Sequence, residues 1–173
     1  MNILCELNDS IVLGSSGLSS KPPRLTARAI VKSQDGLYAV MYAQKFNLYS
    51  LPGGGIEKGE DALTALVREV YEETGCTCDH IEELGIVTEN RASLDYTQIN
   101  HYFVVTTAKI PLQNHLTEAE KASRTEVQWH TLDEAVRLIV EQQFERVQGK
   151  YLRARDVAAL NAYCALVKPK ETI

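Results

Sequence analysis

The stretch that decides the fold of this chain is Gly54-Gly-Ile-Glu-Lys-Gly-Glu60, followed after seven residues by Arg68-Glu-Val-Tyr-Glu-Glu-Thr-Gly-Cys76. Glu69, Glu72 and Glu73 stand at positions i, i+3 and i+4, so on a helix they share one face. Three carboxylates on one face repel each other unless a positive charge lies among them. Clustered oxygen ligands suit a hard divalent cation such as Mg²⁺ or Mn²⁺.

The alternative interpretation of this stretch is an ordinary solvated acidic helix. A solvated face usually interleaves lysines with its acids, whereas the only cation between residues 61 and 75 is Arg68. One apolar stripe is also predicted for this helix, which indicates a buried side. Its members are Leu63, Leu66, Val67 and Val70. The pattern therefore favours a packed helix that carries a cation site over a freely solvated one.

The same stretch resembles the signature of the Nudix hydrolases. That signature is a glycine, five residues, a glutamate, seven residues and Arg-Glu-U-x-Glu-Glu-x-Gly-U, where U is a bulky aliphatic residue. The matching positions are Gly54, Glu60, Arg68, Glu69, Val70, Glu72, Glu73 and Gly75. Only Cys76 departs, since it puts a smaller apolar side chain at a position that packs. The signature covers about an eighth of the chain.

The resemblance implies hydrolysis of a pyrophosphate bond in a nucleoside diphosphate linked to another group X, including nucleoside triphosphates. By analogy, Glu69 and Glu73 are the main metal ligands, and Glu72 is a ligand or a partner of one. A backbone carbonyl of Gly54 or Gly55 would complete the site, because glycine lets the backbone approach an ion closely. The implied cofactor is Mg²⁺ or Mn²⁺.

Arg68 is expected to orient the carboxylates through bidentate hydrogen bonds, a supporting part in catalysis. Glu60 is either a partner of Arg68 or an outer ligand. Many relatives take a general base from the loop after the long central strand. Here that loop, residues 111–125, offers Glu120 and, slightly less favoured, Glu118, unless it is an ordinary solvated loop. Glu72 is the next candidate for the base.

Four further residues are candidates for substrate binding. Arg28 and Lys45 are candidates for contacting phosphate or X, although a lone strand arginine is more often a solvated or paired surface charge. Tyr49 either stacks on a base or packs in the core. Gly53 precedes the signature glycine and belongs to the same predicted loop.

Composition sets modest bounds on function. A chain of 173 residues with a net charge of −5 predicts one domain that does not bind nucleic acid or an anionic membrane. A small anionic substrate stays compatible, because metal ions reverse the local sign of charge. No apolar run approaches the roughly 20 residues that span a bilayer, and the N-terminus lacks the basic region of a signal peptide. We therefore expect a cytoplasmic protein with a small-molecule nucleotide substrate, and a homodimer stays open.

The predicted elements indicate an α/β (α+β) domain. Strands are expected over 25–32, 37–43, 81–88, 98–109 and 126–130, and helices over 61–74, 132–148 and 151–167. The resemblance sharpens this to a Nudix-like α/β/α sandwich with a mixed β-sheet and an acidic catalytic helix. Residues 1–23 are predicted to form an N-terminal hairpin and linker. Residues 24–173 then form a single Nudix-like hydrolase domain that includes two C-terminal helices.

Two other functions compete with hydrolysis. A non-catalytic sensor would use the fold to bind a nucleotide ligand without turnover, but sensors often lose signature glutamates that this chain keeps. About forty residues follow Thr131, too few for a separate DNA-binding domain. An RNA-decapping relative is disfavoured by the missing basic surface.

Overall fold

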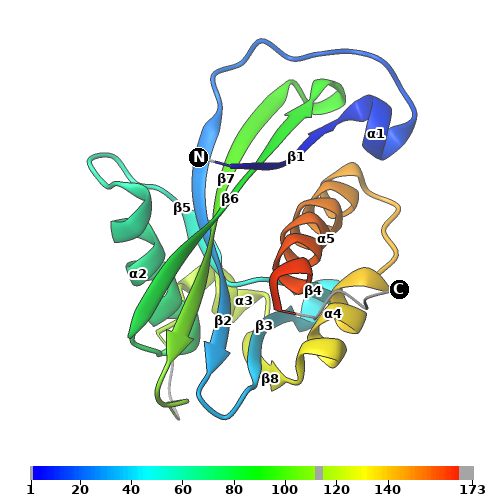
Figure 1. The fold of residues 1–173 in the computed structure, drawn as a ribbon. Helices are drawn as coiled ribbons and strands as arrows, with labels where there is room; N and C mark the ends of the chain where they lie inside the picture. The colour runs from blue at the N-terminus through cyan, green and yellow to red at the C-terminus, as the bar shows by residue number, and fades with distance from the viewer. Residues whose placement is uncertain (1, 112–114, 168–173) are drawn as a thin grey trace, which may run out of the picture.

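The computed structural model describes residues 2–111 and 115–167, without the side chain of Glu120 (Figure 1). Its elements, in chain order, are β1 (Ile3–Asn8), α1 (Asp9–Leu13), β2 (Arg24–Ser33), β3 (Tyr38–Ala43), η1 (Gln44–Phe46), β4 (Leu48–Ser50), β5 (Gly53–Gly55), α2 (Ala62–Thr74), β6 (His80–Arg91), η2 (Ala92–Leu94), β7 (Tyr96–Thr107), α3 (Glu118–Ala122), β8 (Thr125–His130), α4 (Leu132–Val140) and α5 (Val147–Val167).

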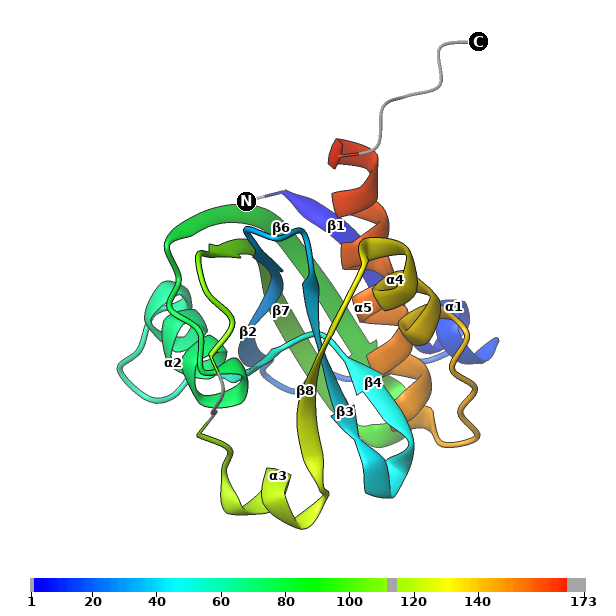
Figure 2. The same ribbon diagram turned by 90° about the horizontal axis from the view of Figure 1, so that it is seen from below.

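The strands form one mixed sheet in the order β1-β6-β7-β2-β3-β4, with β5 also paired to β2 and β8 to β3. β1 with β6 and β2 with β7 are parallel, and the other pairs are antiparallel. Helices α2 and α5 lie on opposite sides of the strands (Figure 2). The predicted α+β class with a mixed sheet and an acidic helix is confirmed.

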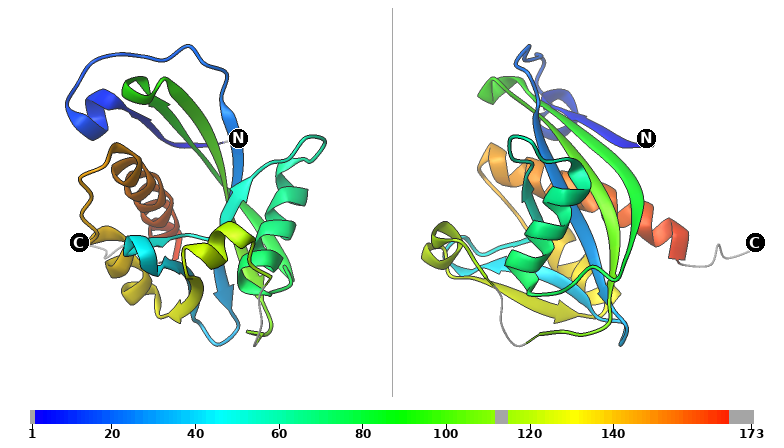
Figure 3. Two further views of the ribbon diagram at one scale, coloured as in Figure 1. Left: turned by 180° about the vertical axis from the view of Figure 1, so that it is seen from behind. Right: turned by 90° about the vertical axis from the view of Figure 1, so that its left-hand side faces the viewer.

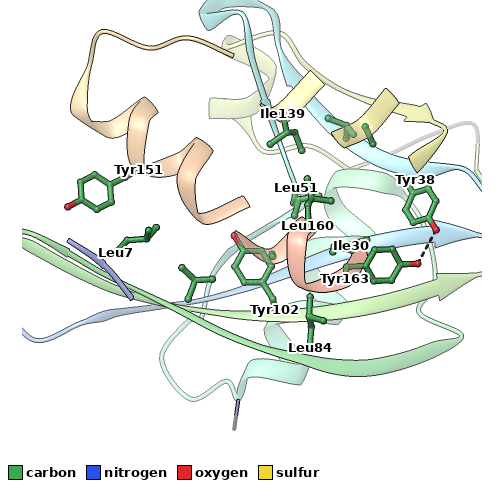
Figure 4. Packing of buried hydrophobic residues seen from close by; sticks show 14 residues of the cluster. Leu7, Ile30, Tyr38, Leu51, Leu84, Tyr102, Ile139, Tyr151, Leu160 and Tyr163 are labelled. Carbon is green, nitrogen blue, oxygen red and sulfur yellow. Dashed lines mark hydrogen bonds between the residues drawn. The ribbon is translucent and has the colours of Figure 1, made fainter. Parts of the chain in front are cut away.

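Alternation along β2 explains the two layers, because successive strand side chains point to opposite faces. Ala27, Ala29 and Val31 face α2 and belong to one buried cluster with Leu66 and Val70 of that helix. Ile30 faces α5 and belongs to a second cluster. That cluster also holds Leu51, Leu84, Tyr102, Leu160 and Tyr163 (Figure 4).

Helix α2 begins and ends where its sequence predicts. The Asp61 side chain accepts the N–H of Thr64 at 2.7 Å, and Gly75 closes the helix in the left-handed conformation with φ of 74°. The predicted apolar stripe is wrong in part. Leu66 and Val70 are buried, but Leu63 is 50% and Val67 45% exposed. Ala65, of smaller volume, occupies the core instead, which lets the helix lie close to the alanines of β2.

The predicted N-terminal hairpin is wrong. β1 runs beside β6 as the edge strand of the sheet, and the chain then turns into the short helix α1 (Figure 3). Asn8, a residue type that favours turns, caps this helix by accepting the N–H of Ile11 at 3.1 Å. Asp9 is buried, where it accepts hydrogen bonds from the Tyr151 hydroxyl and the Ser93 N–H, both at 2.7 Å.

The two C-terminal helices are present, with different bounds from those expected. Helix α4 ends at Val140 rather than near residue 148, and α5 already begins at Val147. A segment over 141–146 separates them. Gln142 in this segment bonds to the backbone of Tyr49 on β4, with its Oε1 accepting at 2.6 Å and its Nε2 donating at 2.9 Å. These contacts tie the connection to the sheet and end the helix there.

Candidate active site

The acid cluster lines a cavity of about 520 Å³ between α2 and the glycine strand β5. Glu69, Glu72 and Glu73 come from one side, and Gly53–Gly55 from the other. A larger cavity of about 780 Å³, beside Phe46 and Phe144, holds none of the signature residues. The chemistry that the sequence predicts therefore belongs to the smaller cavity.

Arg68 organises the carboxylates of this cavity. Its Nε and Nη2 donate to the two oxygens of Glu60, both at 2.9 Å, which makes a bidentate pair. Its Nη1 donates to Glu69 Oε1 at 2.8 Å and to Glu72 Oε2 at 3.4 Å, and Nη2 also reaches the carbonyl of Gly55 at 2.9 Å. The hydrogen bond from Arg68 lowers the pKa of Glu60 to about 2. Glu60 is thus a partner of Arg68.

Glycine is required at two positions of β5 for different reasons. A Cβ at Gly54 would lie 2.4–2.6 Å from the carboxyl atoms of Glu69, so the missing side chain makes room for that carboxylate. Gly53 has φ of 130°, and a Cβ there would lie 2.3 Å from the carbonyl oxygen of Ala27. The N–H of Gly53 donates to Glu73 Oε2 at 2.6 Å. The strand therefore makes room for the Glu69 carboxylate and holds that of Glu73 by a hydrogen bond.

The donor set fits a hard divalent cation in kind. Three acids, Glu60, Glu69 and Glu72, surround Arg68, and Glu73 lines the same cavity, which leaves a local excess of negative charge that a cation would relieve. Among the described residues, however, no three acidic, histidine or cysteine side chains converge on one point. Glu69 is turned to Arg68 and Glu73 to Gly53. Binding an ion would therefore need rotation of these carboxylates within the cavity.

Only some of the predicted substrate-binding residues lie at the acid cavity. Gly53 lines the cavity, but Arg28 does not. Arg28 is buried and donates from Nη1 to the carbonyls of Gly53 at 3.1 Å and Leu51 at 3.4 Å. Burial, followed by the positive charge of Arg155, lowers its pKa. Arg28 therefore supports the backbone of Leu51–Gly53 from inside the protein, because its side chain points to the sheet face that α5 covers.

Lys45 and Tyr49 also lie outside this cavity. Lys45 is exposed in η1, with Nζ 5.7 Å from the centre of the Phe46 ring. Tyr49 is half-buried and stacks on Tyr42, with ring centres 4.4 Å apart. Burial raises the pKa of its hydroxyl. Tyr49 packs on its own sheet, which was the alternative to stacking on a base.

The predicted general-base segment contains the short helix α3. Glu118 at its start is exposed and pairs with Lys121 at 2.8 Å, and this hydrogen bond lowers the pKa of the Glu118 carboxyl. The side chain of Glu120 lies outside what the structure describes. Thr117 lines the acid cavity. The segment thus reaches the site, and its role as the source of the base stays a prediction.

Sequence reasoning missed Arg24, which lines the cavity at the start of β2. Its Nη2 lies 2.9 Å from the position that a Gly55 Cβ would take, and no described carboxylate forms an ion pair with it. Arg68 is engaged with acids, so Arg24 is the exposed arginine of the cavity lining. Alternation gave no signal for this: Arg24 shares the parity of Arg28, whose side chain points to the face that α5 covers, so the strand pattern alone does not place Arg24 at the acid cavity.

The model of the NUDIX domain matches residues 22–154. This chain belongs to the Nudix family. Its acidic helix and mixed sheet are the Nudix elements that the resemblance implies, so the resemblance is confirmed. Nudix hydrolases generally use divalent metal ions, which agrees with the donor set of the cavity.

Relatives with known names match only part of the chain. The RNA pyrophosphohydrolase of Shewanella loihica is 39% identical over 59 residues, which cover 33% of this chain and 32% of that protein. The matched part thus spans about a third of the length of the relative.

Solved structures share the fold at low identity. The MutT protein of Methanosarcina mazei has a TM-score of 0.59 at 18% identity and covers 87% of this chain and 99% of that one. The NUDIX domain of Shewanella oneidensis NrtR, solved with ADP ribose, has a TM-score of 0.54 at 21% identity and covers 78% and 88%. Within the described residues, no helix has the length and apolarity needed to cross a membrane.

Proposed function

We propose that this Nudix protein is a metal-dependent pyrophosphohydrolase that cleaves a P–O–P bond in a nucleoside diphosphate linked to another group X. The observation that carries the proposal is the cavity in which Arg68 organises Glu69 and Glu72 opposite the glycines of β5. Family membership and the named RNA pyrophosphohydrolase relatives support the same chemistry.

Glu69, Glu72 and Glu73, with a carbonyl of Gly54, would hold Mg²⁺ or Mn²⁺. Such ions, when bound, neutralise phosphate oxygens and stabilise the charge that develops during hydrolysis. The protein supplies the positions: Gly54 leaves space for the Glu69 carboxylate, and the N–H of Gly53 holds Glu73.

Arg24 would bind a phosphate oxygen of the substrate at the other edge of the cavity. A guanidinium matches the geometry of phosphate, and its charge offsets the acids across the cavity. A carboxylate from the α3 segment, Glu120 or Glu118, would take the proton of the attacking water, with Glu72 as the next candidate. A base must reach the water within about 2.6–3.2 Å or through one bridging water, and Thr117 brings this segment to the cavity.

The class of X is open between small nucleotides and the 5′ end of RNA. The net charge of −5 favours a small nucleotide. The names of the matched relatives favour RNA. Cleavage at the phosphates does not require a basic surface that follows a long strand, so an RNA end belongs among the substrates to be tested. The alternative function is a sensor that binds a nucleotide without turnover; the NrtR structure with ADP ribose shows a related domain holding such a ligand.

The cellular location and the domain division of the protein are also proposed. We place the protein in the cytoplasm, an assignment supported by four free cysteines at 5, 76, 78 and 164. A division at residue 24 between an N-terminal segment and the Nudix domain stays a prediction, supported by the family match beginning at residue 22. A homodimer also stays untested.

The deciding experiment is a screen of nucleoside triphosphates, dinucleoside polyphosphates, nucleotide sugars and 5′-triphosphorylated RNA with Mg²⁺ or Mn²⁺. Hydrolysis in ¹⁸O-labelled water should place the label on a product phosphate, and excess chelator should abolish turnover. Label on a sugar carbon, or full activity in chelator, would contradict the proposed chemistry. Tight binding of a nucleotide without turnover of any substrate would favour the sensor.

A further inference from the structure

A carboxylate on the C-terminal helix is buried outside the lining of the acid cavity. Asp156 lies in α5 with no exposed surface. Its Oδ2 accepts the backbone N–H of Leu51 at 3.0 Å, and its Oδ1 accepts the Tyr102 hydroxyl at 2.5 Å and Arg155 Nε at 3.2 Å. Burying a carboxylate is costly unless hydrogen bonds and charges compensate it, and an apolar residue would pack there at less cost. This arrangement therefore calls for a reason beyond packing.

The backbone that Asp156 holds leads directly into β5, the glycine strand of the acid cavity. Leu51 is two residues before Gly53, whose N–H donates to Glu73 at 2.6 Å. The Leu51 side chain is 2% exposed and lies beside Leu160 of α5 (Figure 4). Helix α5 thus fixes this residue twice, by its N–H and by its side chain. The N–H that Asp156 accepts, on Leu51, is thus two residues along the chain from the N–H that contacts a proposed metal ligand.

The opposite side of the loop Leu51–Gly53 is fixed by β2. Arg28 donates to the carbonyls of Leu51 and Gly53, and the N–H of Ala29 donates to the carbonyl of Pro52 at 2.9 Å. The polar groups of the loop are therefore held from both layers of the fold. Neither Asp156 nor Arg28 lines the acid cavity, so both act through the loop.

The negative charge of Asp156 also compensates the positive charges of two buried arginines. Arg28 and Arg155 are both buried, and the charge of Arg155 lowers the pKa of Arg28, whereas the charge of Asp156 acts in the opposite direction. Asp156 is the counter-ion that lets two guanidinium groups share the interior. Neutralising it would loosen Arg28 as well as release the N–H of Leu51.

From these contacts we infer that Asp156 is a positioning residue of the active site: it holds Leu51–Gly53 in the geometry that keeps Glu73 at the cavity where a divalent cation would bind. This inference rests on the metal-dependent function proposed above. It makes α5 a part of the active site although the helix contributes no residue to the cavity lining. Partners of ligand residues typically change metal affinity about 10- to 100-fold when they are removed.

The test is Mn²⁺ binding to Asp156→Asn, followed by electron paramagnetic resonance. The matched control is Tyr163→Phe, which removes a buried hydrogen bond of 2.9 Å to Tyr38 from the same helix without touching the loop. Asp156→Asn should weaken Mn²⁺ binding about tenfold or more, and Tyr163→Phe should leave it unchanged. Unchanged affinity in folded Asp156→Asn, or an equal loss in the control, would overturn the inference.

Neutralisation of a buried acid can also prevent folding, so a second variant is needed. Tyr102→Phe removes one hydrogen-bond donor from the same carboxylate and keeps its charge. It should weaken Mn²⁺ binding about threefold, and affinity equal to that of Tyr163→Phe would overturn the inference by itself. If the unaltered protein binds no Mn²⁺ and hydrolyses no substrate, the proposed function fails. If it does both and these variants match the control, only the role of Asp156 fails.

Discussion

A single methyl group added at Gly54 should weaken metal binding and leave the stability of the fold nearly unchanged. In Gly54→Ala the new Cβ would lie 2.4 Å from Glu69 Oε1 and 2.5 Å from Cδ. Since ordinary contacts of this kind begin near 3.5 Å, the carboxylate must move by about 1 Å. That movement acts directly on the hydrogen bond of 2.8 Å between Arg68 and Glu69.

The expected size of the effect follows from what Glu69 does. We expect Mn²⁺ affinity to fall about 10- to 100-fold, as for a displaced ligand or its direct partner. The catalytic rate should fall about 100-fold, the cost typical of a misplacement near 1 Å. Stability should stay within about 1 kcal/mol, because Gly54 has an ordinary backbone conformation and alanine lowers the entropy of the unfolded chain.

The assay compares Gly54→Ala with Gly55→Ala, its neighbour on the same strand. A Cβ at Gly55 would meet only the flexible end of Arg24, at 2.9 Å, and no carboxylate. Mn²⁺ titration and urea denaturation in chelator are measured for both. Wild-type Mn²⁺ affinity in Gly54→Ala, or an equal loss in Gly55→Ala, would refute the argument that this glycine makes room for a metal ligand.

Three other predictions probe the same cavity. Glu73→Gln should lower the catalytic rate about 100-fold or more at unchanged circular dichroism, and full turnover would exclude Glu73 as a ligand. The pKa of Glu60 is lowered from 4.5 to about 2, so its contribution to stability is present above pH 4.5 and is lost as the pH falls toward 2. The difference in urea midpoint between wild type and Glu60→Gln should vanish over that range; a constant difference would contradict the pairing with Arg68. Arg24→Gln should raise KM about tenfold with a smaller change in kcat, whereas Lys21→Gln, an equal change of charge outside the cavity, should change neither. Equal KM values for the two variants would remove Arg24 from the substrate site.

The sequence predicts the elements whose side chains carry a pattern. Helix α2 is bounded by Asp61 and Gly75, and strands β2, β3, β6, β7 and β8 all lie where apolar runs indicate them. Strand β5 was missed because Gly53–Gly55 has no side chains to alternate. The N-terminal segment was assigned to a hairpin because Asn8 and Asp9 favour turns and helix caps through the same side-chain hydrogen bonds.

The sequence predicts those residues of the candidate site that lie close together along the chain. One helix brings Glu69, Glu72 and Glu73 together, and the signature supplies Arg68. Site residues on other elements could not be predicted without knowing which strands pair with each other. Arg24 enters the cavity because β2 lies beside β5, a register that no local pattern reveals.

Strand β1 has a practical consequence for any shortened version of the protein. The family match begins at residue 22, so a fragment cut to that boundary would lose β1 and the buried Asp9. Residues 86–90 of β6 would then present unpaired backbone N–H and C=O groups along an open sheet edge. Such edges template pairing between molecules. The trimmed fragment should therefore associate through edge-to-edge pairing of its open strands. Dimers of the fragment would then result from the truncation and would not show a native subunit arrangement.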